Sequence, residues 1–295
     1  MKLLLNNERV DINKANKNDA TPFYVACQQG HIEVVKLLLN DNRVDINQAT
    51  NDGITPFYIA CQKGRLEIMK LLLNDNRVDV NKTLNSGGTT PFWMACQRGS
   101  VKIVKLLLDD ERVDINKAGK NGTTPFWTAC HDGQVEIVEL LLKDERVDIN
   151  KTMNSNGETP FCAACWSGHI VIVKMLLKDE RVDINKPWSN GATPFWISCY
   201  KGRIDIVKLL LACGREGDIN KKDNYGTTGL DIAREDLESE EDFENRKKNC
   251  LKIVELIELV ERNPIDTRTK LRMELGFTGK FIYLSIFQFK IHLLT

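Results

Sequence analysis

Cysteine and histidine are the residue types in this chain whose chemistry could support a metal site or a redox centre. Six of its nine cysteines recur at steps of 34 or 35 residues, at Cys27, Cys61, Cys96, Cys130, Cys165 and Cys199. A ladder with that spacing does not bring four ligands to one zinc ion, and its members would exceed the roughly 7 Å Cα separation that a disulfide allows. A free cysteine packs well as a small apolar side chain. We therefore predict buried structural cysteines, with metal or redox chemistry as the alternative.

Cys162 and Cys165 form the single Cys-x-x-Cys pair, a spacing that can lower a thiol pKa. Cys165 belongs to the recurring ladder, however, and no second pair is present to complete a zinc site. The four histidines show no metalloprotease spacing, and the sequence contains no nucleophile elbow or phosphate-binding loop. We expect no catalytic residue, no metal and no cofactor. An active site built from the repeats is the alternative.

The charge balance and composition exclude several classes of protein. The 295 residues include 41 Lys+Arg and 41 Asp+Glu, for a formal net charge of zero. Nucleic-acid binders usually carry a net basic face, so we expect no nucleic-acid partner. No run of about eighteen apolar residues and no signal-peptide core is present, so we expect no membrane partner. The expected compartment is the cytoplasm, with the nucleus as the alternative.

The cysteine ladder is one column of a repeat that covers most of the chain. Each copy contains Asp-Ile/Val-Asn, a polar stretch, Thr-Pro-Phe, Ala/Ser-Cys, Gly and an Ile-Val…Leu-Leu-Leu run, in that order. Thr-Pro-Phe begins at Thr21, Thr55, Thr90, Thr124, Thr159 and Thr193, and a degraded Thr-Gly-Leu begins at Thr228. A period of this length indicates a repeat architecture.

Each repeat predicts two short helices. In the first copy, a threonine cap followed by proline starts a helix over 21–29, and Gly30 ends it. A second helix is predicted over 32–40 from its apolar face. Dipeptides such as Asp52-Gly53 predict tight reversals between the copies. Helices this short are marginal alone, so the repeats must stack on their neighbours.

The segment Thr21–Leu39 resembles the ankyrin repeat, whose pattern contains Thr-Pro-Leu-His-x-Ala, a Gly-His turn and an Ile-Val-x-Leu-Leu-Leu second helix. The resemblance covers residues 1–262. It implies an all-α solenoid of about seven stacked helix-turn-helix units joined by hairpin loops. It also implies that the first helices and the hairpin tips line a concave surface that recognises another protein.

Both ends of the repeat region are irregular. Met1–Leu5 aligns with the second-helix segment Val35–Leu39, so the chain begins midway through a unit, either by truncation or with 1–7 as a frayed remnant. The last repeat is degenerate and contains an acidic insertion over 235–249. Residues 263–295 form a C-terminal tail, with a short helix predicted over 267–276. The alternation after Ser285 indicates a strand, unless residues 277–295 are a gene-model artefact.

Charged and amide side chains also form ladders between the repeats. Arginines precede aspartates by two residues in six copies, as in Arg43 and Asp45, and we predict that they pair within and between the loops. An anion-binding arginine stripe is the alternative. We predict that a column of asparagines ties neighbouring hairpins together by side-chain hydrogen bonds, at Asn13, Asn47, Asn81, Asn116, Asn150, Asn185 and Asn220.

Two columns at the end of the first helix vary from copy to copy. They read Gln28, Gln62, Gln97, His131, Trp166, Tyr200 and Gln29, Lys63, Arg98, Asp132, Ser167, Lys201. Variable exposed positions beside fixed ones favour partner recognition, and Trp, Tyr and Arg dominate interface hot spots. The candidate partner-binding residues are Gln97, Arg98, His131, Asp132, Trp166, Trp188, Tyr200 and Lys201. The fixed aromatic column that includes Trp93, Trp127 and Trp196 is expected to pack between repeats.

The sequence therefore predicts a non-catalytic scaffold or adaptor, monomeric, that binds a protein partner on the concave face. One alternative is a fragment or targeting arm of a larger signalling protein or enzyme whose activity lies outside this chain. Another is that the acidic segment Glu235–Glu244 grips a basic partner, although charge runs are usually solvated loops.

Overall fold

The computed structural model describes residues 10–215, 217–238 and 244–277. Within these ranges the protein contains fifteen α-helices, labelled α2 to α16, and no β-strand. The chain divides into two compact units, residues 1–148 and residues 149–295. The all-α prediction is therefore confirmed for the described residues.

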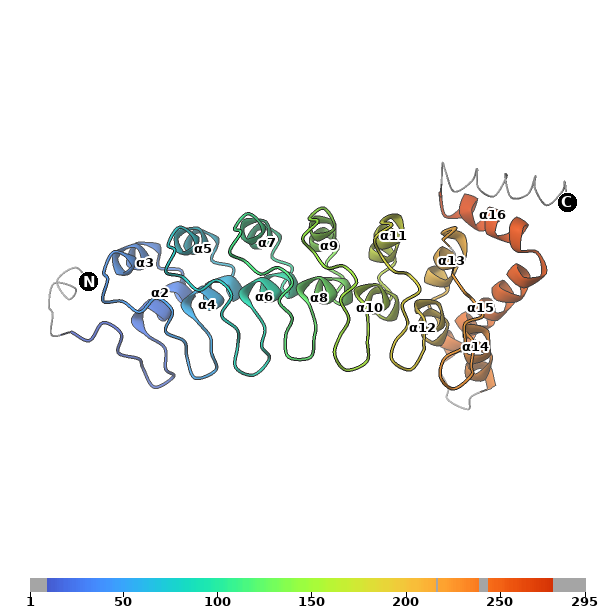
Figure 1. Ribbon diagram of the computed structural model, residues 1–295, viewed down its shortest axis with the longest axis horizontal. Coiled ribbons are helices and arrows are strands. Elements are labelled where there is room, and N and C mark those ends of the chain that lie inside the picture. The colour runs from blue at the N-terminus through green and yellow to red at the C-terminus, as the bar shows by residue number, and fades with distance from the viewer. Residues whose placement is uncertain (1–9, 216, 239–243, 278–295) are drawn as a thin grey trace. The chain divides into compact units, whose positions relative to one another are not determined.

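The first unit consists of four helix pairs, one pair for each repeat. They are α2 (Pro22–Gln29) with α3 (Ile32–Leu39), α4 (Pro56–Gln62) with α5 (Leu66–Leu73), α6 (Pro91–Gln97) with α7 (Val101–Leu108), and α8 (Pro125–His131) with α9 (Val135–Leu142). In Figure 1 the first helices of this unit form one row, the second helices form another, and the hairpin tips extend on a common side. Neighbouring first helices contact one another, as do neighbouring second helices.

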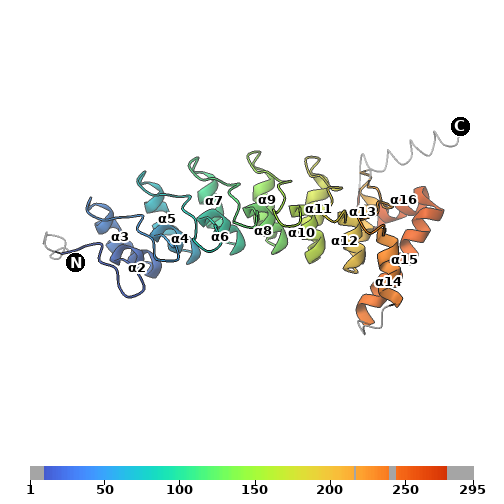
Figure 2. The same ribbon diagram turned by 60° about the horizontal axis from the view of Figure 1, so that its bottom comes forward.

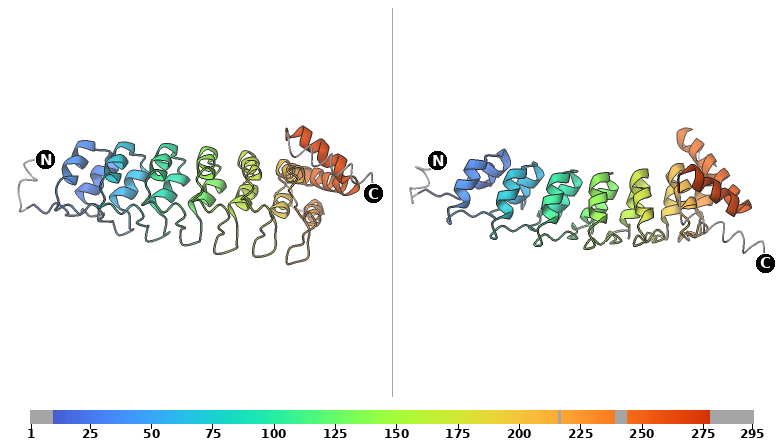
Figure 3. Two further views of the ribbon diagram at one scale, coloured as in Figure 1. Left: turned by 45° about the horizontal axis from the view of Figure 1, so that its top comes forward. Right: turned by 90° about the horizontal axis from the view of Figure 1, so that it is seen from above.

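The second unit contains the remaining elements. They are α10 (Pro160–Ser167) with α11 (Ile170–Lys178), α12 (Pro194–Tyr200) with α13 (Ile204–Ala212), α14 (Gly229–Glu238) with α15 (Glu244–Arg262), and α16 (Pro264–Glu274). Helix α14 packs on α12 and α15, and α16 packs against α13 and α15 (Figures 2 and 3).

Threonine caps fix the start of each first helix, as the sequence predicts. From α2 to α12 the Thr hydroxyl accepts the backbone N–H three residues later at 3.0–3.1 Å, and proline follows at the first helical position. Helix α14 lacks the proline. There Thr228 and Asp231 cap each other: the Thr228 N–H donates to the Asp231 carboxylate at 2.9 Å, and the Asp231 N–H donates to the Thr228 hydroxyl at 3.1 Å.

The cysteine ladder lies in the dry interior between helices. All nine cysteines are free and buried, and the six ladder cysteines are at most 1% exposed. They pack beside a phenylalanine column of comparable burial, which includes Phe23, Phe57 and Phe92. Within each unit, neighbouring helix pairs pack on one another, as expected for a repeat stack.

The predicted asparagine ladder is confirmed for five of its members, whose side chains bond to the following repeat. The Asn47 amide donates to the Arg77 carbonyl at 2.7 Å, and its side-chain oxygen accepts from the Asp79 N–H at 2.8 Å. Asn13, Asn81, Asn116 and Asn150 make the same two bonds to the following repeat. Asn220 donates its backbone N–H to Asp218. One side chain therefore joins two successive loops.

The predicted partner of the loop arginines is wrong. Arg43 pairs with Asp41, two residues before it, at 2.6 Å, and not with Asp45. The same arrangement joins Arg77 to Asp75, Arg112 to Asp110, Arg146 to Asp144, and Arg181 to Asp179. The later aspartate has another function: Asp45 accepts the backbone N–H of Asn47 and shapes its own turn. Each of these five arginines therefore already has a carboxylate partner.

Three loop arginines also bind carbonyls of the preceding repeat. Arg77 donates to the Leu39 carbonyl at 2.8 Å, Arg112 to the Leu73 carbonyl at 2.7 Å, and Arg146 to the Leu108 carbonyl at 2.9 Å. Each of these carbonyls ends a second helix and has no partner inside it. The arginine therefore caps one repeat from the next.

The C-terminal region forms three helices. The described parts of the segment 235–249 are helical: α14 continues to Glu238, and α15 begins at Glu244, earlier than the apolar run at Leu251 indicates. The helix predicted over 267–276 is present as α16. The strand predicted after Ser285 and the N-terminal remnant lie outside the described residues. Among the described helices, none combines the length and apolar character needed to cross a bilayer.

Candidate protein-binding surface

Four of the eight candidate residues lie in the first unit. Gln97 ends α6, and its carbonyl accepts the side-chain amide of Gln134 at 3.1 Å. Arg98 is the exposed C-cap of the same helix. His131 ends α8, where it stacks on Trp127 with ring centroids 4.8 Å apart, and its Nδ1 lies 2.7 Å from Asp132. The structure thus joins His131 to Asp132.

The other four candidates come together in the second unit. Trp166 lies at the end of α10, Tyr200 ends α12, and Trp188 lies in the hairpin tip between them. The Trp166 and Trp188 ring centroids are 5.3 Å apart, and those of Trp166 and Tyr200 are 6.2 Å apart. All three side chains are half-buried. We call Trp166, Trp188 and Tyr200 the aromatic cluster.

One repeat has a small residue in the fixed aromatic column, and Trp188 packs beside it. Five copies have Tyr or Trp at the third helical position, but α10 has Cys162. Cys162 forms a small core with Ala192 and Ile197, and Trp166, Trp188 and Trp196 pack against it. Burial raises the Cys162 pKa to about 12, so the thiol is neutral. The small Cys162 side chain leaves room for Trp188 from the hairpin tip, where other repeats have a large ring.

Lys201, the C-cap of α12, lies over the aromatic cluster. Its Nζ is 3.5 Å from the Trp166 ring centroid and 5.4 Å from that of Tyr200. Contacts of this kind between an ammonium group and ring faces are attractive. Burial lowers the pKa of Lys201, and the nearby Arg246 and Arg203 lower it further.

Two arginines that the sequence does not indicate complete the site. The Arg246 guanidinium lies 5.0 Å from the Tyr200 ring, donates to the Tyr200 carbonyl at 2.8 Å and pairs with Asp236. Arg203 donates to the Trp166 carbonyl at 3.2 Å. Arg65 makes the equivalent bond to the Gln28 carbonyl, so repeat comparison could have found Arg203. Arg246 comes from the insertion, where no repeat register exists to indicate it.

Two members of the fixed aromatic column contact the next repeat, as expected for Trp196. The Tyr58 hydroxyl lies 3.2 Å from the Thr89 hydroxyl of the next hairpin, and the Trp196 indole donates to Thr227 at 3.3 Å. Trp196 also stacks on Tyr200, with ring centroids 5.4 Å apart, and so contacts the aromatic cluster. Trp93 and Trp127 are half-buried.

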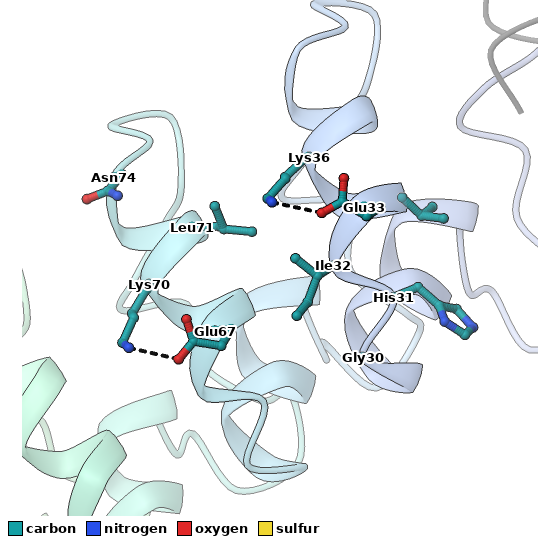
Figure 4. Close-up of a pocket in the computed structure, with 10 residues that line it drawn as sticks. Gly30, His31, Ile32, Glu33, Lys36, Glu67, Lys70, Leu71 and Asn74 are labelled. Carbon is teal, nitrogen blue, oxygen red and sulfur yellow. Dashed lines mark hydrogen bonds and ion pairs between the residues drawn. The ribbon is translucent and has the colours of Figure 1, made fainter.

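A separate groove of about 820 Å³ lies between α3 and α5 (Figure 4). Its charged side chains are already paired, Lys36 with Glu33 at 2.8 Å and Lys70 with Glu67 at 2.8 Å. None of the eight candidate residues lines it. Over the residues that the structure describes, no group of three or more His, Cys, Asp or Glu side chains could hold a metal ion.

Comparison with protein families identifies this architecture. A profile for three-copy ankyrin repeats matches residues 1–84, 42–118, 76–152 and 92–187, and a profile for the single ankyrin repeat matches residues 190–224. The chain therefore belongs to the ankyrin repeat family, as the sequence indicates.

Solved structures show the same fold. The ankyrin repeat domain of Bcl-3, described as a unique member of the IkappaB protein family, has a TM-score of 0.66 and 22% identity, over 73% of this chain and 95% of that domain. The human ASB11 ankyrin repeat domain has a TM-score of 0.62 and 23% identity, over 79% and 97%. Comparison with curated proteins found no match to this sequence.

Proposed function

We propose that this protein is a non-catalytic scaffold or adaptor that binds a partner protein at the ends of its first helices and at its hairpin tips. Ankyrin repeats are known as protein-interaction modules, which supports this class of function. The observation that carries the proposal is the aromatic cluster, in which three large rings are only half-buried. A partner that covers them would remove apolar area from water.

The physical properties of the cluster favour binding. Trp and Tyr bury much area while losing few rotatable bonds, which is why they dominate interface hot spots. The rings already contact one another and the Cys162 core, so little ordering entropy is lost on association. Gln97, Arg98, His131 and Asp132 lie at equivalent positions of the first unit, and we propose them as further contacts.

The proposed setting is a monomer in the cytoplasm, with the nucleus as the alternative. Nine free, buried thiols fit a reducing compartment.

The test is affinity capture from cell extract followed by mass spectrometry, with the full chain as bait. The double variant Trp166→Ala, Tyr200→Ala should lose the proteins that the wild type captures. Gln62→Ala, at the same repeat position as Trp166 but away from the rings, should retain them. Circular dichroism and thermal unfolding would show that the variants are folded. Unchanged capture by the folded double variant would show that the partner binds elsewhere.

A further inference from the structure

Among the residues that the structure describes, three cations lie beside the aromatic cluster. Lys201 and Arg246 both lie against the rings, and Arg203 is anchored to the Trp166 carbonyl beside them. Within the described ranges, one ion pair joins any of these three cations to a carboxylate, and it links Arg246 to Asp236. Lys201 and Arg203 therefore have no ion-paired carboxylate in the described part of the chain.

Lys201 is the least compensated of the three. Within the described ranges its ammonium group has no carboxylate in ion-pair distance, and ring faces occupy its nearest surroundings. Both arginines repel it, and partial burial removes some of its water. A half-buried charge in this position costs free energy that an opposite charge can recover. Lys63 of the second copy lies at the equivalent position and offers a contrast. It is exposed, and it follows Gln62 where Lys201 follows Tyr200.

We propose, resting on the proposed function, that the aromatic cluster selects a partner segment in which an Asp or Glu side chain lies next to an apolar one. The carboxylate binds the Lys201 ammonium group, beside Arg203. The apolar neighbour packs on the exposed parts of Trp166 and Trp188.

Charge complementarity favours an acidic protein segment over nucleic acid. A nucleic-acid strand needs a basic surface long enough to neutralise several phosphates. Here three cations surround one set of rings, one of them is already paired, and the chain as a whole has no net charge. A single carboxylate flanked by apolar side chains matches this site in both size and charge.

The test is a selection of random peptides displayed on phage against the immobilised full chain, followed by sequencing. Peptides enriched by the wild type should contain more Asp and Glu than the starting library, each next to an apolar residue. An enriched peptide, made synthetically, should bind Lys201→Met about 10-fold more weakly than wild type, as expected for loss of a charged hydrogen bond. Lys63→Met is the matched control and should bind like wild type.

Charge reversal makes the test more stringent. Selection against Lys201→Glu should enrich Lys and Arg instead of Asp and Glu. If peptides enriched by the wild type show no excess of acidic residues, or if Lys201→Met binds them as well as wild type does, the inference is wrong. Retention of a single-stranded DNA oligonucleotide that Lys201→Met abolishes would also overturn it, in favour of nucleic acid.

The proposed function and this inference fail in different ways. Suppose that the enriched peptides contain no more Asp and Glu than the library, and that Trp166→Ala abolishes their binding. The cluster is then a binding site that does not select acidic residues, and only the inference fails. If peptides enriched by the wild type bind Trp166→Ala and Tyr200→Ala unchanged, the cluster is not the site, and both proposals fail. Thermal unfolding of each variant would show that a loss of binding is not a loss of fold.

Discussion

Five of the six loop arginines have an aspartate two residues before them and another two residues after them, and the structure chooses between the two. In the first such loop, Arg43 lies two residues after Asp41 and two before Asp45. Asp41 accepts from both the backbone N–H and the guanidinium of Arg43, whereas Asp45 accepts from the Asn47 backbone. The ladder of charges was readable from the sequence. The partner was not, because equal spacing gives no preference.

These ion pairs make stability depend on pH in the acid range. The hydrogen bonds from Arg43 lower the pKa of Asp41 from 3.8 to about 2, and the Arg112 side chain lowers that of Asp110 in the same way. A carboxyl group whose pKa is lower in the folded state stabilises the fold above its unfolded pKa. That stabilisation is lost as the pH falls through the folded pKa. We expect the urea midpoint to fall between about pH 4 and pH 2.

The variant Asp110→Asn should lose less stability on acidification than the wild type, because it has no carboxyl group to protonate at that position. The difference should stay below about 1 kcal/mol, since the pair is partly solvated. Urea unfolding of both proteins over the same pH series would measure it. Equal acid sensitivity would show that Asp110 does not contribute.

The buried thiols give a second prediction at this scale. Burial raises the pKa values of Cys27, Cys61 and Cys162 to about 12, so these groups are protonated at neutral pH. A thiol reagent attacks the thiolate. We expect the folded protein to react with such a reagent only very slowly at about pH 8, and all nine thiols to react in concentrated guanidinium chloride.

The same experiment tests the redox alternative for Cys162 and Cys165. Rapid reaction of one thiol in the folded protein, abolished by Cys162→Ala, would support the redox alternative and contradict the structural one. The burial of Cys165 was predictable, because it shares a column with five other cysteines. That Trp188 packs on Cys162 was not, since the two residues belong to different repeats.

At the scale of elements, capping explains how far the sequence could predict the fold. Threonine before proline predicted the start of each first helix from α2 to α12 to within a residue, because both residue types act locally. The start of α15 was missed: its first turn contains Glu244 and Arg246, which carry no apolar period. That turn is held by contacts far along the chain, from Arg246 to Tyr200 and Asp236. The same contacts explain why the basic side of the candidate site was not predicted.

Loops between repeats depend on single amide side chains. Asn81 donates to the Arg112 carbonyl at 2.6 Å and accepts from the Asp114 N–H at 2.8 Å. Asn81→Ala removes both bonds and leaves two backbone groups without their partner, at a cost of about 1–3 kcal/mol. Urea unfolding would measure the loss. Asn76→Ala, at an exposed position earlier in the same connection between α5 and α6, is the control. Equal destabilisation by the two substitutions would show that the asparagine ladder does not stabilise the stack.

At the scale of the whole molecule, stability is expected to be distributed among neighbouring repeats. Each helix pair contacts the adjacent pairs in its unit, so a local defect should spread only to its neighbours. The last repeat has no further helix pair among the described residues. Helix α16 instead packs against α13 and α15, and its Leu271 belongs to the same core as Val207 and Ile257. Arg272 donates to the Ala212 carbonyl at 2.8 Å and caps α13.

This arrangement predicts which helices lose protection from hydrogen exchange when the packing of α16 is weakened. Leu271→Ala removes a side chain that is 4% exposed and should cost about 2–5 kcal/mol locally. Hydrogen exchange followed by mass spectrometry should show faster exchange in α13 and α15 and no change in α3 or α5. Met273→Ala, at a residue that is 64% exposed on the same helix, should leave exchange unchanged throughout. Faster exchange of similar size in every helix after Leu271→Ala would mean that the chain unfolds as one cooperative body, and the nearest-neighbour description would then be wrong.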